Sequence, residues 1–408
     1  MDSLSPTVVT PPNPASDDDG RSRVSNHETL STVQIGLGST GVVAGGAERV
    51  FSELATYLPA CGVEFCAAVV TAGERPNTSD NQQYSFAPAG AKIQTRLLGA
   101  RRVIRKLLSS GRFDLVASHF ALYSLPAIDA IHKQPFVVHF HGPWAAESIE
   151  EGSGWAAAHA KYLIEKLVYS QADRLIVLSK AFSEVLVKNY GIPEQKIRIV
   201  PGAVDTQRFA VSESKAEARQ ALGWPQDRPI LISIRRLAHR MGLDLLIDAL
   251  PTIIAKPPDV LLHIGGTGSL RESLERRVRD LNLTDHVRFL GFVQDDKLPL
   301  AYRAADFNVV PTRAWEGFGL VAAEAVASGT PSLVTPVGGL PEVIAPLSPD
   351  LIFRSVSVND IADGLIQALS GAVAIPDSAR CRAFAAEHFS AQTMAARTAA
   401  VYREIARS

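Results

Sequence analysis

Two carboxylates, Glu316 and Glu324, stand on either side of a glycine-bracketed turn in the segment 311–324. An apolar run that predicts a strand precedes the turn, and an apolar stretch that predicts a helix follows it. Gly317 and Gly319 let the backbone approach a ligand closely, and the amides of a helix start favour negative charge or hydroxyls. Carboxylates accept hydrogen bonds. The segment therefore predicts a ligand site in which Glu316 accepts from a sugar and Glu324 from a vicinal diol such as a ribose.

The surroundings of Glu324 strengthen this prediction. For an isolated pair of this spacing, the simpler interpretation is a helix cap at Glu316 and a solvated helix face at Glu324. Here the residues of 321–327 other than Glu324 are apolar and cover nearly every side of the helix, so we expect the helix to be buried. A buried carboxylate needs a partner, and a ligand could be that partner.

This element, with its small-residue helix and the turn Gly329–Ser332, resembles the retaining glycosyltransferases of family 4. The resemblance continues through residues 336–342 and 287–293 and spans nearly the whole chain after the first thirty residues. It implies two doubly wound, Rossmann-like α/β domains that face each other across a cleft, the GT-B arrangement. It also implies that Phe318 and Leu320, with the two glycines beside them, bind a nucleotide-sugar donor.

Alternating apolar and helical stretches support an α/β fold with parallel sheets covered on both faces. The expected strands are Thr32–Leu37, Glu64–Val70, Asp114–Ser118, Phe136–Phe140, Arg174–Leu178 and Ile197–Val200 before a break near Asp205–Pro229, and Pro229–Ile234, Val260–Ile264, Val287–Leu290, Phe307–Val310, Ser332–Thr335 and Leu351–Phe353 after it.

A chain of 408 residues is long enough for two such domains. We expect a disordered tail over residues 1–30, an N-terminal acceptor domain over 31–205 and a C-terminal donor domain over 206–385. The resemblance implies that a last helix, within 386–408, returns to the first domain.

Cations must stabilise the diphosphate that leaves during sugar transfer, and the segment 233–244 supplies them. By the resemblance, Arg236 is the arginine of the family's Arg-x4-Lys element, and Met241 stands where the lysine is usual. A thioether cannot replace an ammonium, so either the guanidinium of Arg240 compensates, which we favour, or the donor diphosphate is held less tightly. Arg235 is expected to be a surface charge.

No metal is expected. The pair Asp295–Asp296 lies in a polar segment that starts a helix, where a capping role is the simpler interpretation, and no convincing Asp-x-Asp motif ends a strand. Two further loops are candidates for the nucleotide: Gly268 in the cluster 265–269, and Phe292 with Val293, which by the resemblance present backbone groups to the base.

The first domain carries two glycine loops. Residues 36–41 match the dinucleotide fingerprint G-x-G-x-x-G, but no acidic residue ends the second strand, which argues against a dehydrogenase. The segment 45–49, with Gly46, fits the family's loop that faces the cleft.

Three histidines, His119, His139 and His141, lie at or just beyond the ends of strands of the first domain. Strand alternation sends His139 and His141 to one face. His141 sits where its strand exits into a Gly-Pro turn, and the resemblance places it beside the reacting sugar. We expect His139 to be structural and give His119 a weaker claim to the acceptor side.

Composition narrows the class further. The net charge of −1 shows no bias toward nucleic acid, and three cysteines at no metal-ligand spacing argue for a reducing cytoplasm. No run of 18 apolar residues occurs. A basic segment near Arg101–Arg112 could rest on anionic lipid as a peripheral contact, and a packed helix with a solvated cationic face is about as good an interpretation.

The sequence thus predicts a metal-independent glycosyltransferase in polysaccharide or glycolipid assembly, with catalytic roles for His141, Glu316 and Arg236. Its substrates would be a donor such as a UDP-, GDP- or ADP-sugar and a sugar or lipid-linked acceptor. Two rivals stay open: a catalytically silent sugar-nucleotide-binding subunit, because of Met241, and a glycoside hydrolase that uses the two carboxylates.

Overall fold

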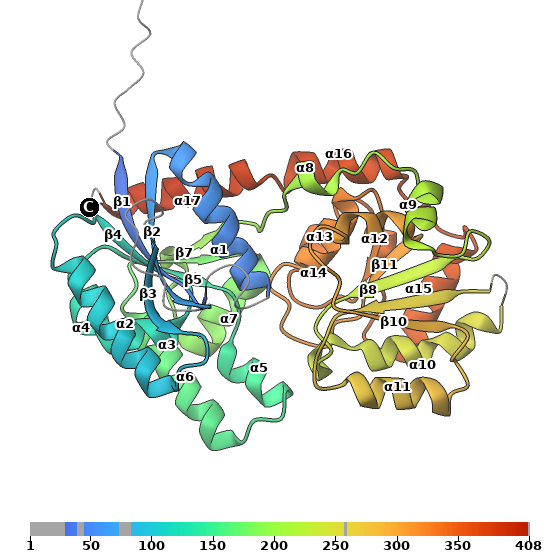
Figure 1. Ribbon diagram of the computed structural model, residues 1–408, viewed down its shortest axis with the longest axis horizontal. Coiled ribbons are helices and arrows are strands. Elements are labelled where there is room, and N and C mark those ends of the chain that lie inside the picture. Colours follow the sequence, from blue (N-terminus) through green and yellow to red (C-terminus); the bar gives the residue numbers. More distant parts are fainter. Residues whose placement is uncertain (1–28, 39–44, 73–82, 257–258, 407–408) are drawn as a thin grey trace, which may run out of the picture.

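A computed structural model describes residues 29–38, 45–72, 83–256 and 259–406. Two parallel sheets form the centres of two α/β domains that lie side by side (Figure 1). The predicted fold class, two doubly wound domains, is confirmed. The boundaries proposed at residues 205 and 385 stay a prediction.

The N-terminal sheet has seven strands in the order β3-β2-β1-β4-β5-β6-β7. Its strands are β1 (Leu30–Ile35), β2 (Val63–Thr71), β3 (Gln83–Pro88), β4 (Leu115–Ser118), β5 (Phe136–Phe140), β6 (Arg174–Val177) and β7 (Ile197–Ile199). Every residue of β4 and β5 is buried, as helices on both faces of a parallel sheet require. The prediction missed β3, because this edge strand is short of apolar residues and ends in proline.

The C-terminal sheet has five strands in the order β10-β9-β8-β11-β12. They are β8 (Ile230–Ile234), β9 (Leu261–Gly265), β10 (Val287–Gly291), β11 (Phe307–Val310) and β12 (Ser332–Val334). The strand expected at Leu351–Phe353 is wrong in part. A 3-10 turn, Pro349–Leu351, occupies its start, and Ile352 makes only a single bridge to Val334.

Helices cover both sheets. They are α1 (Gly46–Tyr57), α2 (Ile93–Leu108), α3 (Ala121–Ser124), α4 (Ile128–Ile131), α5 (Trp144–Glu150), α6 (Trp155–Ser170), α7 (Lys180–Tyr190), α8 (Thr206–Phe209), α9 (Lys215–Leu222), α10 (Leu243–Ile254), α11 (Arg271–Asp280), α12 (Leu298–Ala304), α13 (Leu320–Ala327), α14 (Leu340–Ile344), α15 (Val358–Leu369), α16 (Ser378–His388) and α17 (Ala391–Ala406). Short 3-10 turns lie at Pro59–Cys61, Leu125–Ala127, Glu194–Lys196, His239–Met241 and Pro349–Leu351.

The chain passes between the domains twice, and the two passages touch. The amide of Val204 donates to the carbonyl of Phe389 at 2.9 Å, and Val204 bridges Ser390. Beyond this point α17 lies along the N-terminal domain (Figure 1), where Met394 and Tyr402 are buried with residues of the first sheet.

The strand orders define where ligands bind in such folds. In each sheet the order reverses once, between β1 and β4 in the first and between β8 and β11 in the second. Open parallel sheets bind ligands outside the carboxyl ends of their strands at this reversal. The loops and helix starts that follow β1, β8 and β11 carry most of the predicted site residues, while His141 follows β5, Gly268 follows β9, and Phe292 and Val293 follow β10.

Candidate active site

Glu316 and Arg235 form the centre of the C-terminal face of the site. Arg235 follows β8 and Glu316 follows β11, and their side chains pair at 3.0 Å. The Arg235 guanidinium also donates to Thr312 Oγ1 at 2.9 Å. Burial lowers the pKa of Arg235, and the Glu316 carboxylate opposes that shift. The site thus holds a buried guanidinium directly beside the first carboxylate of the motif.

The expectation for Arg235 is therefore wrong. Its side chain is 4% exposed, whereas that of its neighbour Arg236 is 51% exposed. An exposed loop was expected here, but Arg235 donates its amide to the carbonyl of Gly265 and so lies against the loop after β9. From this position the side chain of Arg235 points inward and contacts Thr312 and Glu316.

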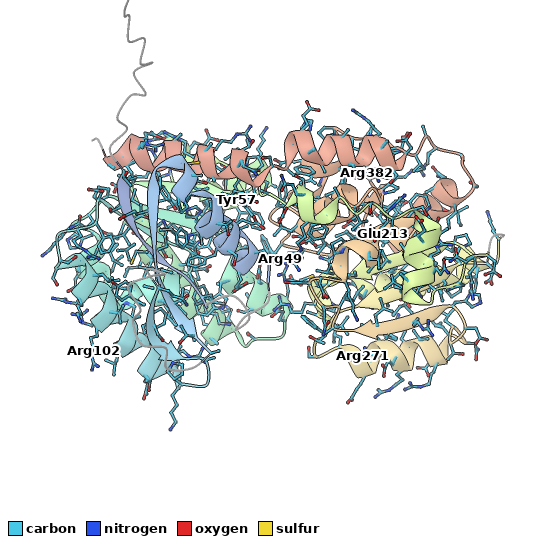
Figure 2. The ribbon with its side chains drawn as sticks, turned by 45° about the horizontal axis from the view of Figure 1, so that its top comes forward. Arg49, Tyr57, Arg102, Glu213, Arg271 and Arg382 are labelled. Carbon is cyan, nitrogen blue, oxygen red and sulfur yellow. The ribbon has the colours of Figure 1, made fainter. Side chains whose placement is uncertain are left out.

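Glu324 is buried, as the apolar helix around it predicts. Tyr302 donates its hydroxyl to Glu324 Oε2 at 3.3 Å, and the Arg49 guanidinium pairs with Glu324 Oε1. Arg49 comes from α1 of the N-terminal domain, and Figure 2 shows it where the two domains meet. The chain itself thus supplies the partner for which we considered a ligand.

Two helix starts meet at the same place. α1 begins after Gly45 and α13 after Gly319, and neither has a side-chain cap. A Cβ on Gly46 would lie 3.5 Å from the Leu320 side chain, so the helix starts are in contact distance across the domains. Uncapped helix N-termini present free amides and positive potential, which suit a phosphate.

Arg236 and Arg240 lie at the same junction. Arg236 pairs with Glu151 at 2.7 Å, and Arg240 approaches Glu147 at 3.5 Å and Glu151 at 3.6 Å. Glu147 lies in the first turn of α5 and Glu151 directly follows that helix, so both come from the N-terminal domain. Burial raises the pKa of Glu147, and the two arginines oppose that shift. Two carboxylates therefore occupy the cationic groups predicted to hold a diphosphate.

Arg240 is well placed for the compensating role. Its guanidinium donates to the carbonyl of Trp315 at 2.9 Å, directly before Glu316, and its side chain is only 12% exposed. Met241 is buried. Arg236 shares an electrostatic contact with Glu48, which adjoins the Arg49 that reaches Glu324. Arg236 and Glu324 thus face the same end of α1.

The glycine loop after β9 packs on the arginine loop. The amide of Leu237 donates to the Thr267 carbonyl at 2.8 Å, and Gly266 and Gly268 both have positive φ. A side chain at either glycine would collide with the backbone of residues 235–237. These glycines are therefore required for loop packing, beside any role that Gly268 has toward a nucleotide.

The remaining donor-loop residues divide into two kinds. Phe292 is 63% exposed after β10, and Val293 packs near Gly265. Phe318 is buried, with its ring 2.7 Å from a Cβ built on Gly202. The Phe318 side chain is thus a packing group between the domains, and only its backbone is available to a ligand.

Three histidines stack at the carboxyl ends of β4 and β5. The rings of His119 and His139 have centroids 4.1 Å apart, and His119 Nδ1 lies 3.1 Å from His141 Nε2. His119 Nε2 contacts Gln34 Oε1 at 3.1 Å, and His139 Nε2 contacts the Tyr402 hydroxyl at 2.7 Å. Burial lowers the pKa of His119 and His139 well below the usual value and that of His141 to about 4. All three imidazoles are therefore neutral near pH 7.

Phe182 on α7 joins the histidine side to the carboxylate side. A Cβ on Gly317 would lie 2.7 Å from its ring, and one on Gly142 would lie 3.8 Å from it. Gly142 follows His141 and Gly317 follows Glu316, so both motifs converge on one aromatic ring. A cavity of about 290 Å³ opens beside it, lined by residues 181, 182 and 185 of α7 and by 314, 315, 337 and 338.

The sequence interpretation missed Arg49, Tyr302, Glu147, Glu151, Gln34 and Tyr402 as parts of this site. Some signal was present. Arg49 is the last residue of the segment 45–49, which was expected to face the cleft, and Glu147 and Glu151 are four residues apart just after the Gly-Pro turn at 142–143. Tyr302 and Tyr402 gave none, because a buried tyrosine in an apolar helix is an ordinary core residue.

Part of the dinucleotide-like fingerprint lies outside the described residues, namely 39–41. Within 29–38, 45–72, 83–256 and 259–406, no group of three or more His, Cys, Asp or Glu side chains is arranged to hold a metal ion. The helices in those ranges include none that is long and apolar enough to cross a membrane.

Together, the fold and the site define an α/β protein with two Rossmann-like domains and a charged cleft between them. Comparison with protein families agrees. Residues 214–388 match the family described as glycosyl transferases group 1, and residues 44–208 match glycosyltransferase family 4. The chain belongs to this family of glycosyltransferases.

Individual relatives support the assignment. The D-inositol 3-phosphate glycosyltransferase 2 of Catenulispora acidiphila is 31% identical over 72% of this chain and 71% of its own length. The mannosylfructose-phosphate synthase of Agrobacterium fabrum is 37% identical over 43% of this chain. The match spans 40% of that relative's own length.

A solved structure shows the same fold. The Anabaena protein HepE, in complex with UDP and glucose, superposes with a TM-score of 0.74 at 18% identity, over 92% of this chain and all of that one. The comparison confirms the GT-B architecture of two Rossmann-like domains.

Proposed function

We propose that this protein transfers a sugar from a nucleotide-sugar donor to an acceptor hydroxyl, with retention at the anomeric carbon and without a metal ion. One observation supports this most strongly: the uncapped starts of α1 and α13 meet beside Arg236 and Arg240. Such a junction offers amides, helix dipoles and guanidinium groups to one diphosphate.

Each part of the donor has its own partners in the site. The diphosphate lies between the two helix starts and replaces Glu147 and Glu151 as the partner of the arginines. The ribose hydroxyls donate to Glu324, and Arg49 moves aside to allow this. Beyond the diphosphate, the sugar then lies between Glu316 and His141, whose neighbouring glycines share the Phe182 ring.

The reaction forms a bond between the acceptor oxygen and the anomeric carbon and breaks the bond from that carbon to the diphosphate. Positive charge from Arg236 and Arg240 stabilises the leaving oxygen. That oxygen takes the proton of the acceptor hydroxyl on the same face of the sugar, so no enzyme nucleophile is required. The protein contributes positioning and charge.

The acceptor enters through the cavity between α7 and the loop at Trp315, which adjoins Glu316. We keep polysaccharide or glycolipid assembly in the cytoplasm as the proposed setting. The face of α2 with Arg101, Arg102, Arg105 and Lys106 is exposed, although Arg101 and Arg105 also pair with Asp129. Figure 2 shows Arg102 on the outside of its domain. Binding to anionic vesicles that salt abolishes would support a membrane-bound acceptor.

Turnover of labelled UDP-, GDP- and ADP-sugars against sugar-phosphate and lipid-linked acceptors tests the proposal. We expect one donor to be used, with transfer at least 100-fold slower in Arg236→Ala. Arg276→Ala, an exposed arginine on α11, is the matched control and should retain activity. Nucleotide binding without any turnover would instead favour the silent subunit, and a wild-type rate in Arg236→Ala would contradict the proposed site.

A further inference from the structure

A chain of hydrogen bonds runs beneath His141 through the N-terminal sheet. It begins on β1 with Thr32 and Gln34, crosses to His119 after β4, and ends at His141 after β5. Thr32, Gln34 and His119 are all buried. Because a neutral imidazole has one donor nitrogen and one acceptor nitrogen, such a chain has a direction.

Thr32 sets that direction at its start. Its hydroxyl donates to the carbonyl of Glu64 at 2.7 Å, so its oxygen accepts from Gln34 Nε2 at 2.8 Å. This fixes the side-chain amide of Gln34 with Oε1 turned the other way. Oε1 accepts from the Tyr402 hydroxyl at 3.2 Å and faces His119 Nε2 at 3.1 Å.

The histidines then follow from Gln34. His119 Nε2 must carry the proton that Gln34 Oε1 accepts, so His119 Nδ1 has a lone pair. His119 Nδ1 accepts in turn from His141 Nε2 at 3.1 Å. His141 is therefore protonated at Nε2 and holds a lone pair at Nδ1.

His141 Nδ1 is the open end of the chain. It is buried and has no hydrogen-bond partner within residues 29–38, 45–72, 83–256 and 259–406. A buried acceptor of this kind is costly to leave unsatisfied. The following residue, Gly142, lies against Phe182 and against Glu147, which reaches across the cleft to Arg240. His141 thus directly precedes a residue in the wall of the cleft.

Neutrality of the imidazoles supports the argument. Burial lowers the pKa of all three histidines, and close stacking of His119 on His139 disfavours a second proton in the group. The single proton on each ring can then be placed by the hydrogen bonds alone.

We propose that Gln34 and His119 are positioning residues that hold His141 as the Nε2–H tautomer, so that its Nδ1 accepts a hydrogen bond from a hydroxyl of the bound sugar. The contact between His141 Nδ1 and the sugar rests on the proposed function. The tautomer of His141 does not, because it is a property of the free protein.

Nitrogen NMR of protein labelled with ¹⁵N-histidine tests the tautomer directly, with His141→Asn used to assign the resonance. In the ligand-free wild type at neutral pH, we expect His141 Nδ1 to be unprotonated and Nε2 protonated. A protonated Nδ1 would overturn the proposal.

Two variants test the chain, and a third controls for packing. Thr32→Val frees the Gln34 amide to turn over, and Gln34→Met removes the acceptor, so each should give His141 a mixture of tautomers. Tyr402→Phe removes another contact of the same Gln34 oxygen and should leave His141 unchanged. An unaltered His141 in both Thr32→Val and Gln34→Met would overturn the role of the chain; if Gln34→Met does not fold, Thr32→Val decides alone.

Kinetics test the link to the sugar. In Thr32→Val we expect kcat to fall roughly two- to ten-fold, the worth of one hydrogen bond, with the Kd of the nucleoside diphosphate unchanged. Equal loss of nucleotide affinity would contradict a contact to the sugar. If the wild type transfers no sugar at all, the proposed function fails, while the NMR result still judges the tautomer.

Discussion

The two faces of the cleft work by different physical means. The N-terminal face presents neutral imidazoles whose protons are placed by buried hydrogen bonds, from Gln34 to His141. The C-terminal face presents guanidinium groups and carboxylates, with Arg235 beside Glu316 and Arg240 near them. Hydrogen bonds between neutral groups orient a ligand but contribute little binding energy. Charged groups bind a ligand more strongly and can exchange one charged partner for another. The N-terminal face is suited to recognising the hydroxyls of a sugar, and the C-terminal face is suited to binding a diphosphate.

The charged face also explains what the unliganded cleft contains. The ion pairs that join the domains include Arg49 with Glu324, Arg236 with Glu151, and Arg240 with Glu147. Each uses a group that we assign to the donor. A donor bound in the proposed way displaces Glu147 and Glu151 from the arginines and Arg49 from Glu324, so part of its binding energy is spent on breaking these contacts.

Removing the buried charge should have the largest effect. Arg235→Met removes the buried cation and leaves the partly buried Glu316 carboxylate without its ion-pair partner. We expect transfer to fall at least 100-fold and the free energy of unfolding to fall by about 3 kcal/mol. Urea unfolding and donor turnover measure the two effects, with Arg276→Met on α11 as control. Near-normal turnover would show that the charged face does not need this guanidinium.

Arg240→Met should be milder. It removes a largely buried cation whose guanidinium donates to the Trp315 carbonyl, and it leaves Arg236 in place. We expect the Kd of the nucleoside diphosphate to rise about ten-fold, because a charge-assisted hydrogen bond is lost. Calorimetric titration gives the value. Wild-type affinity would mean that Arg240 does not compensate for Met241.

The neutral face predicts a pH dependence of stability. Native His119, His139 and His141 have pKa values lowered by burial, so below the ordinary value of 6.5 the unfolded chain binds more protons. Stability should then be complete above pH 6.5 and fall as the pH drops below it. Each histidine contributes about 1.4 kcal/mol between pH 7.5 and 5.5. In urea unfolding, His139→Phe should reduce the loss by about that amount, and an unchanged loss would contradict a neutral stack.

The smallest predicted effect is a gain in affinity for the nucleoside diphosphate. Glu151→Gln removes a charged competitor of the donor at Arg236 and Arg240, so we expect nucleoside diphosphate to bind roughly three-fold more tightly. Glu150→Gln, an exposed neighbour on α5, is the control and should leave affinity unchanged. Weaker binding in Glu151→Gln would show that this carboxylate supports the donor site rather than competing for it.

The sequence predicts the strands and the residues at their ends better than it predicts the partners of those residues. The strands at Phe136–Phe140 and Phe307–Val310 match the structure residue for residue, because fully buried parallel strands are continuous apolar runs. Glu316 and Glu324 belong to the motif that follows one of these strands, and His141 directly follows the other. All three could therefore be identified from the sequence as candidate site residues. Their partners could not, since Arg49 reaches Glu324 from 275 residues away.

Arg235 illustrates the limit most sharply. Adjacent arginines in a loop look alike in sequence, and only packing decides which one is buried. The backbone of residues 235–237 is fixed against Gly266 and Gly268, and that turns Arg235 inward to Glu316 while Arg236 stays at the surface near Glu151. The difference depends on a contact between loops of two strands, which no local pattern encodes.

The central claim is that the cleft holds a sugar nucleotide by its diphosphate. Calorimetric titration with UDP, GDP and ADP, each beside its monophosphate, tests this most directly. We expect one diphosphate to bind at least ten-fold more tightly than its monophosphate, and Arg236→Ala to remove that advantage. Equal binding of diphosphate and monophosphate, or no binding of any of the six nucleotides, would contradict the claim.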